Sequence, residues 1–139
     1  MHRVLLADHD ENLLATYREF LLRDGFDVLT ARDGLDCVAK LRSFMPEALV
    51  MEADLPWGQG EGVLAMMYED PKVPLIPVLV LSTSHNPEGR LGIFPVSVYQ
   101  VKPLAPFRLA QSLRRLLRRD YAGTEVHWTG ADLRGLIDR

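Results

Sequence analysis

The feature that most constrains the fold is a regular alternation of short apolar runs with segments whose apolar residues recur every three or four positions. Apolar runs of four or five residues are typical of strands buried on both faces of a sheet, and the periodic segments are typical of amphipathic helices. Parallel neighbouring strands need crossover connections, which such helices supply. The alternation therefore predicts an α/β fold with a parallel sheet covered by helices on both faces.

Five strands are predicted along the chain, over residues 4–7, 27–30, 48–51, 78–81 and 97–101. Helices are predicted from about Leu13, Leu35 and Val63, and a last helix from about Leu104 to Arg119. Between the fourth and fifth strands, residues 85–95 contain two prolines and two glycines and no helical repeat. We therefore expect a fourth helix that is short or absent.

The length of 139 residues accommodates one domain of ordinary size. We expect it to span residues 1–120, with residues 121–139 forming a C-terminal tail or the start of a further segment. A single cysteine, Cys37, excludes an internal disulfide, and no apolar run reaches the length of a membrane span. The balance of 47% hydrophobic and 25% charged residues disfavours disorder. We expect a soluble, cytoplasmic protein that does not bind membranes.

Polar and charged residues cluster where four of the predicted strands end. They are Asp8, His9 and Asp10 after the first strand, Glu52 at the third, Ser82 at the fourth and Lys102 after the fifth. In an open parallel sheet, ligands bind beyond the carboxyl ends of the strands, near the switch in strand order. We therefore expect these side chains to converge on one site.

Four segments resemble the motifs of the receiver domains of two-component response regulators. They are residues 4–10 (VLLADHD), 46–56 (PEALVMEADLP), 77–82 (PVLVLS) and 99–103 (YQVKP), in the family's order and at nearly its spacing. The resemblance covers residues 3–119 and implies a flavodoxin-like three-layer sandwich with strand order 2-1-3-4-5. It also implies a non-enzymatic signalling protein whose partners are a histidine kinase or an output protein, with a homodimer as a further possibility.

The resemblance also assigns roles to individual residues. In this family an aspartate ending the third strand accepts a phosphoryl group, a carboxylate-bound divalent cation neutralises charge, and a lysine and a hydroxyl contact the phosphoryl oxygens. The family has a proline four residues after the acceptor, so Pro56 places Glu52 at the acceptor position. Ser82 and Lys102 match the phosphoryl-contact positions, and Tyr99 matches the switch aromatic.

The chain departs from the family at the acceptor and metal positions. Glu52 replaces aspartate and extends the carboxylate by about 1.5 Å, whereas a misplacement of about 1 Å already costs roughly a hundredfold in a positioned reaction. His9 replaces the aspartate that binds magnesium directly, and imidazole is a poor ligand for that ion. Asp10 and Asp54 lie near this degenerate Asp8, His9 and Glu52 site. We expect an atypical receiver, or pseudo-receiver, without conventional phosphorylation, with weak or lost Mg²⁺ binding and no other cofactor.

Three alternative functions remain. The first is a working receiver that is phosphorylated on Glu52 or Asp54. The second is a small metal-binding protein in which His9 and His85 act with Asp8 or Glu52. The third is a nucleic-acid-binding module that uses the arginines of the last helix, Arg108, Arg114, Arg115, Arg118 and Arg119. Cations near a helix C-terminus are favourable on a solvated face, so we expect no nucleic-acid binding.

Several site residues also admit purely structural roles. Asp10 has the position and side chain of a helix N-cap. Tyr99 can be a half-buried strand tyrosine, and Ser82 can bond only within its own loop. Lys102 follows a strand end beside several carboxylates, which favours an ion pair in the cleft over a free surface lysine.

Overall fold

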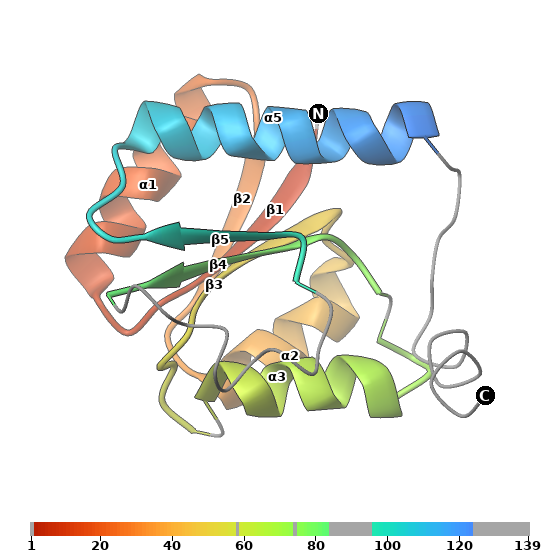
Figure 1. Cartoon of the computed structure of the whole chain (residues 1–139). Helices are drawn as coiled ribbons and strands as arrows, with labels where there is room; N and C mark the ends of the chain where they lie inside the picture. Colours follow the sequence, from red (N-terminus) through yellow and green to blue (C-terminus); the bar gives the residue numbers. More distant parts are fainter. Residues whose placement is uncertain (1, 58, 74, 84–95, 124–139) are drawn as a thin grey trace.

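The computed structural model describes residues 2–57, 59–73, 75–83 and 96–123. Its strands are β1 (Arg3–Ala7), β2 (Asp27–Ala31), β3 (Ala48–Glu52), β4 (Val78–Ser82) and β5 (Val98–Val101). Its helices are α1 (Glu11–Arg23), α2 (Gly34–Phe44), α3 (Gln59–Glu69) and α5 (Pro106–Gly123), as Figure 1 shows. The predicted alternation of strands and helices is confirmed.

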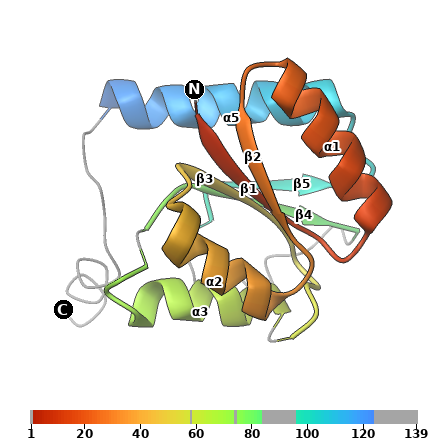
Figure 2. The ribbon, with the colours of Figure 1, turned by 180° about the vertical axis from the view of Figure 1, so that it is seen from behind.

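The five strands pair in parallel, as the sequence pattern predicted, and in the order β2-β1-β3-β4-β5 that the receiver resemblance implied. Helices α1 and α5 cover one face of the sheet, and α2 and α3 cover the other (Figures 1 and 2). Successive residues of a strand pack into the two cores on opposite faces of the sheet, because side chains alternate across a sheet. In β1, Leu5 packs with Leu41 of α2, whereas Leu6 packs with Leu14 of α1. Because the strands are parallel, their carboxyl ends lie together at one edge of the sheet.

Local chemistry sets the beginning of α1 at that edge. Asp10 is the N-cap, and its Oδ1 accepts hydrogen bonds from the backbone N–H groups of Asn12 (3.0 Å) and Leu13 (3.1 Å). This satisfies two of the donors that a helix start leaves without an internal partner. The structural role predicted for Asp10 is therefore confirmed.

The last helix differs from its predicted bounds. It begins at Pro106 instead of Leu104, and it runs to Gly123 instead of ending near Arg119. Proline has a preset φ and no N–H, which suits the first helical position, so the helix starts there. The helix thus crosses residue 120, the predicted end of the domain. The segment for which a short or absent fourth helix was predicted, residues 85–95, lies outside the described residues, and so does most of the predicted tail, residues 124–139.

Within the described ranges, no helix combines the length and the apolarity that crossing a bilayer requires.

Candidate functional site

The carboxyl ends of β1, β3, β4 and β5 bring four of the predicted side chains to one edge of the sheet. Asp8 directly follows β1, Glu52 ends β3 and Ser82 ends β4, and each is only 4% exposed. Lys102 directly follows β5, and its backbone N–H donates to the Ser82 carbonyl at 2.8 Å. Buried charges are costly unless they are paired, so the partners of these groups determine what the site can do.

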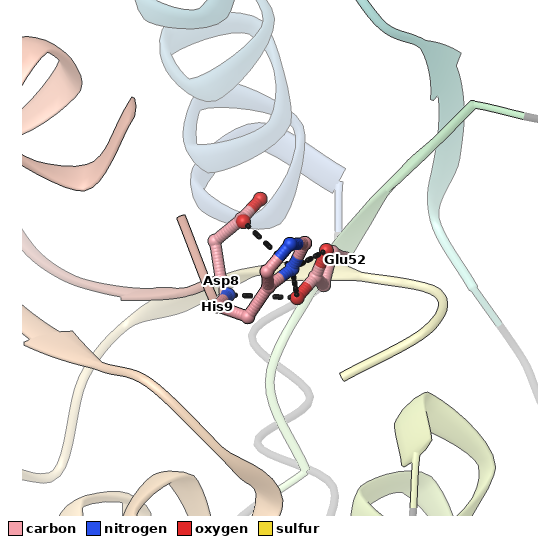
Figure 3. Close-up of side chains that lie close together, drawn as sticks. All are labelled: Asp8, His9 and Glu52. Atoms are coloured by element: carbon pink, nitrogen blue, oxygen red, sulfur yellow. Dashed lines mark hydrogen bonds and ion pairs between the residues drawn. The ribbon is translucent and has the colours of Figure 1, made fainter. Parts of the chain in front are cut away.

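The Glu52 carboxylate is held mainly by His9. Its Oε1 accepts the His9 backbone N–H at 2.7 Å and lies 2.6 Å from His9 Nδ1, and its Oε2 lies 2.9 Å from the same Nδ1 (Figure 3). An ionised carboxylate only accepts hydrogen bonds, so Nδ1 carries the proton in this contact. The hydrogen bond and the negative charge of Glu52 raise the pKa of His9 above its usual value of 6.5. The pair is thus a charge-assisted contact between an exposed imidazole and a buried acid.

The Asp8 carboxylate is held by Lys102. Lys102 Nζ lies 2.7 Å from Asp8 Oδ2 and 3.4 Å from Glu52 Oε2, so the ammonium bridges the two buried acids. Burial alone lowers the pKa of Lys102, but the bonds and charges of Asp8 and Glu52 together raise it. With His9 protonated, two positive and two negative groups form a neutral cluster.

Besides Ser82, which ends β4 at the same edge of the sheet, three predicted site residues lie outside this cluster. Asp10 is exposed and caps α1; its backbone N–H, not its carboxylate, contacts the site by donating to Asp8 Oδ1 at 2.9 Å. Asp54 is exposed and is not among the acids that group with His9. Tyr99 is half-buried in β5 and packs against the core under α2 and α3, which matches its structural alternative.

Asp8, His9 and Glu52 each offer one donor atom within 4.8 Å of the others, so this trio is the candidate metal centre within the described part of the chain. Mg²⁺ prefers a near-ideal octahedron of oxygen ligands. The trio instead includes an imidazole nitrogen, and the Lys102 ammonium already contacts Asp8. The residues present therefore do not match a magnesium site. His85, the other histidine considered as a ligand, lies outside the described residues.

Two contacts at the site were missed by the sequence interpretation. One is the His9–Glu52 pair, because His9 was considered only as a metal ligand and not as a hydrogen-bond partner of Glu52. The other joins Tyr17 of α1 to the segment after β5, where the tyrosine hydroxyl donates to the Leu104 carbonyl at 2.7 Å. A tyrosine on the apolar face of a predicted helix was an available signal, because a buried phenol normally finds a hydrogen-bond partner.

No protein-family model matches the chain. It is 32% identical over 122 residues to the transcriptional regulatory protein PrrA of Mycobacterium tuberculosis, covering 84% of this chain and 50% of PrrA. It is 26% identical over 119 residues to the alkaline phosphatase synthesis transcriptional regulatory protein PhoP of Bacillus subtilis, covering 84% of this chain and 49% of PhoP. The chain therefore spans about half the length of these curated relatives.

Solved structures of receivers share the fold. The chemotaxis response regulator CheY4 of Vibrio cholerae superposes with a TM-score of 0.76 at 24% identity, covering 84% of this chain and 98% of CheY4. The receiver domain of sensor histidine kinase PA1611 from Pseudomonas aeruginosa PAO1, which has a magnesium ion coordinated in its active-site cleft, gives 0.75 at 18% identity, with 84% and 98% covered. The chain therefore has the fold of receiver domains, and it is similar in sequence to response regulators.

Proposed function

We propose that this domain is a pseudo-receiver that acts in cytoplasmic two-component signalling through protein contacts, without conventional phosphorylation of its acceptor position. The observation that carries the proposal is the state of Glu52. Its buried carboxylate is already bonded to His9 and faces the Lys102 ammonium. The acceptor position is thus occupied by an internal ion cluster.

The geometry of Glu52 disfavours attack on phosphorus. Phosphoryl transfer depends on positioning the attacking oxygen in line with the leaving oxygen and on neutralising the charge that builds up. Oε1 accepts the His9 backbone N–H at 2.7 Å, and Nδ1 lies 2.6 Å from Oε1 and 2.9 Å from Oε2. An attack by the Glu52 carboxylate on phosphorus would have to break these bonds and start from a side chain about 1.5 Å longer than aspartate. It would also proceed without the magnesium-binding aspartate that His9 replaces.

The cluster also suggests how the domain works without phosphorylation. Asp8, Glu52, His9 and Lys102 balance their charges within the site, so the two buried acids are neutralised without Mg²⁺. A receiver held in one state can still dock a histidine kinase, an output protein or a second copy of itself. Its action is then a contact and not a catalytic step.

Intact-mass measurement after incubation with acetyl phosphate and Mg²⁺ tests this proposal. The wild-type chain is expected to keep its mass. The double variant His9→Asp/Glu52→Asp restores both family residues and is expected to gain the mass of one phosphoryl group. Rapid, stoichiometric modification of the wild-type chain would contradict the proposal.

Two further variants separate the alternative acceptors. A wild-type mass gain that survives Glu52→Gln but disappears in Asp54→Asn would assign phosphorylation to the exposed Asp54. A gain that disappears only in Glu52→Gln would show that Glu52 is a working acceptor. Either result would replace the pseudo-receiver with the corresponding functional receiver.

The arginine-rich α5 is not part of the proposed function. Arg114 forms an ion pair with Asp24 at the end of α1, and Arg108 lies over the ring of Phe107. Arginines engaged within the fold contribute less to a nucleic-acid surface. Salt-sensitive binding of the chain to duplex DNA would contradict this part of the proposal.

A further inference from the structure

We propose that Asp8, His9 and Glu52 form a binding site for a divalent transition ion of the Zn²⁺ type, in place of the magnesium site of a receiver. The proposal concerns the ion chemistry of the site and does not require that Glu52 escapes phosphorylation. Its evidence is the geometry, the donor chemistry and the burial of these three residues.

The spacing of the donor atoms suits one small ion. Zinc binds imidazole nitrogen and carboxylate oxygen at about 2.0–2.2 Å, which in a tetrahedral site separates neighbouring donors by about 3.3 Å. His9 Nδ1 lies 2.9 Å from Glu52 Oε2 and 3.6 Å from Asp8 Oδ1, on either side of that value. All three donors lie within 4.8 Å of one another, so rotation of the exposed His9 ring and movement of the carboxylates toward it would bring one donor from each residue to a common ion.

The chemistry of the donors selects against Mg²⁺. An imidazole beside two carboxylates suits zinc, copper, nickel and iron, whereas magnesium requires hard oxygen ligands and gives up its water reluctantly. The ion would replace the proton that now lies between Nδ1 and the Glu52 carboxylate, because a ligating histidine must be neutral. Zinc has no preferred geometry of its own and tolerates three protein ligands and a water.

The burial of the site provides both rigidity and access. Asp8 and Glu52 are 4% exposed, so the protein holds their positions, while the His9 side chain is 62% exposed and opens the site to solvent. Asp8 Oδ2 is buried and is ion-paired with the Lys102 ammonium at 2.7 Å. A cation therefore already occupies the position next to the proposed ion, and Lys102 is its competitor.

Metal titration of the full chain, freed of metal with a chelator, tests the proposal. Zn²⁺ is titrated in competition with a chromophoric chelator, and Co²⁺ is used as a spectroscopic probe of the ligand set. We expect one Zn²⁺ bound per chain, no displacement by Mg²⁺ at equal concentration, and visible Co²⁺ absorption bands of a low-coordinate nitrogen and oxygen site. Absence of one-to-one Zn²⁺ binding, or equal competition by Mg²⁺, would overturn the proposal.

Substitutions assign the binding to this site. Loss of a residue that only supports a metal ligand costs about 10–100-fold in affinity, so His9→Ala, which removes a ligand, should weaken Zn²⁺ binding by at least about a hundredfold. His2→Ala is the matched control, because His2 Nδ1 also lies 2.7 Å from a glutamate, Glu47, but outside the three-residue group. The control should bind Zn²⁺ as the wild type does. Equal affinities in the wild-type chain and His9→Ala would refute the assignment.

A third variant is expected to gain Zn²⁺ affinity, which a merely structural role of these residues would not produce. Lys102→Met removes the competing ammonium, so Zn²⁺ should bind at least about tenfold more tightly. Should His9→Ala fail to fold, Glu52→Gln is the second ligand variant and is expected to weaken Zn²⁺ binding in the same direction. None of these measurements involves a phosphoryl donor, so they succeed or fail independently of the mass experiment on phosphorylation.

Discussion

Replacing Lys102 with methionine tests whether the ion cluster stabilises the fold. Lys102 Nζ lies 2.7 Å from Asp8 Oδ2 and 3.4 Å from Glu52 Oε2, and the three side chains are 16%, 6% and 5% exposed. Methionine keeps most of the aliphatic stem but leaves two buried carboxylates without their shared cation. Removing one partner of a buried ion pair typically costs about 3–5 kcal/mol. The expected loss is at the lower end, about 3 kcal/mol, because His9 still pairs with Glu52.

Urea denaturation followed by circular dichroism measures this loss. With a slope of about 2 kcal/mol per molar urea, the unfolding midpoint should fall by about 1.5 M. Arg42→Met is the matched control, because it breaks an ion pair with Asp70 whose arginine side chain is 45% exposed, and such pairs contribute about 1 kcal/mol or less. Adding Asp8→Asn to Lys102→Met should recover part of the loss by removing an unpaired charge. The reasoning is refuted if Lys102→Met loses no more stability than the control.

Three further predictions concern the His9–Glu52 pair, two helical glycines and the buried cysteine. The Glu52 hydrogen bond raises the pKa of His9 above 6.5, so the stability from this pair is fully present below pH 6.5 and is lost as pH rises through the raised pKa. The difference in unfolding free energy between wild type and His9→Ala, measured in the presence of a chelator, should therefore shrink with rising pH. A difference that grows with pH would contradict this prediction. A Cβ at Gly34 would overlap a backbone carbonyl oxygen of the β3–α3 loop, so Gly34→Ala should cost about 1–3 kcal/mol in thermal or urea unfolding. A Cβ at Gly62, inside α3, would meet nothing within 4 Å, so Gly62→Ala should stabilise the folded chain by about 0.5–1 kcal/mol. Equal effects of the two substitutions would refute the contact argument. Burial raises the pKa of the Cys37 thiol to about 12. A thiol reagent at neutral pH should therefore label the unfolded chain readily and the native chain slowly. Rapid labelling of the native chain would contradict this prediction and show that the core around α2 opens easily.

The strands and the edge of the sheet that carries the site were predictable from the sequence for a local reason. A short run such as Val4–Ala7 followed by an acid identifies both a buried strand and its end within a few residues. Val4, Leu5, Leu6 and Ala7 are buried, and Asp8 follows them directly. Parallel pairing then brings strand ends such as Glu52 and Ser82 to the same edge without any knowledge of side-chain positions.

The partners within the site were less predictable. Asp10 has the same charge as Asp8 and lies two residues away, yet it caps α1 while Asp8 binds Lys102. Glu52 was expected to converge on one site with Ser82 and Lys102, but its shortest contacts are to His9. For Glu52 the distances are 2.6 Å to His9 and 3.4 Å to Lys102, a difference of less than an ångström between groups that follow different strands, which no pattern along the chain encodes.

The sequence by itself determined the alternation of strands and helices, the burial of each strand and the set of charged groups at the edge of the sheet, because periodicity and burial are properties of neighbouring residues. Only the tertiary structure decided that His9 pairs with Glu52, 43 residues away, and that Lys102 bridges Asp8 and Glu52 at the ends of separate strands. The physical reason is that pairing energies between buried charges vary steeply with distance and solvent exposure, and both are set only when the strands and the loops after them are packed together.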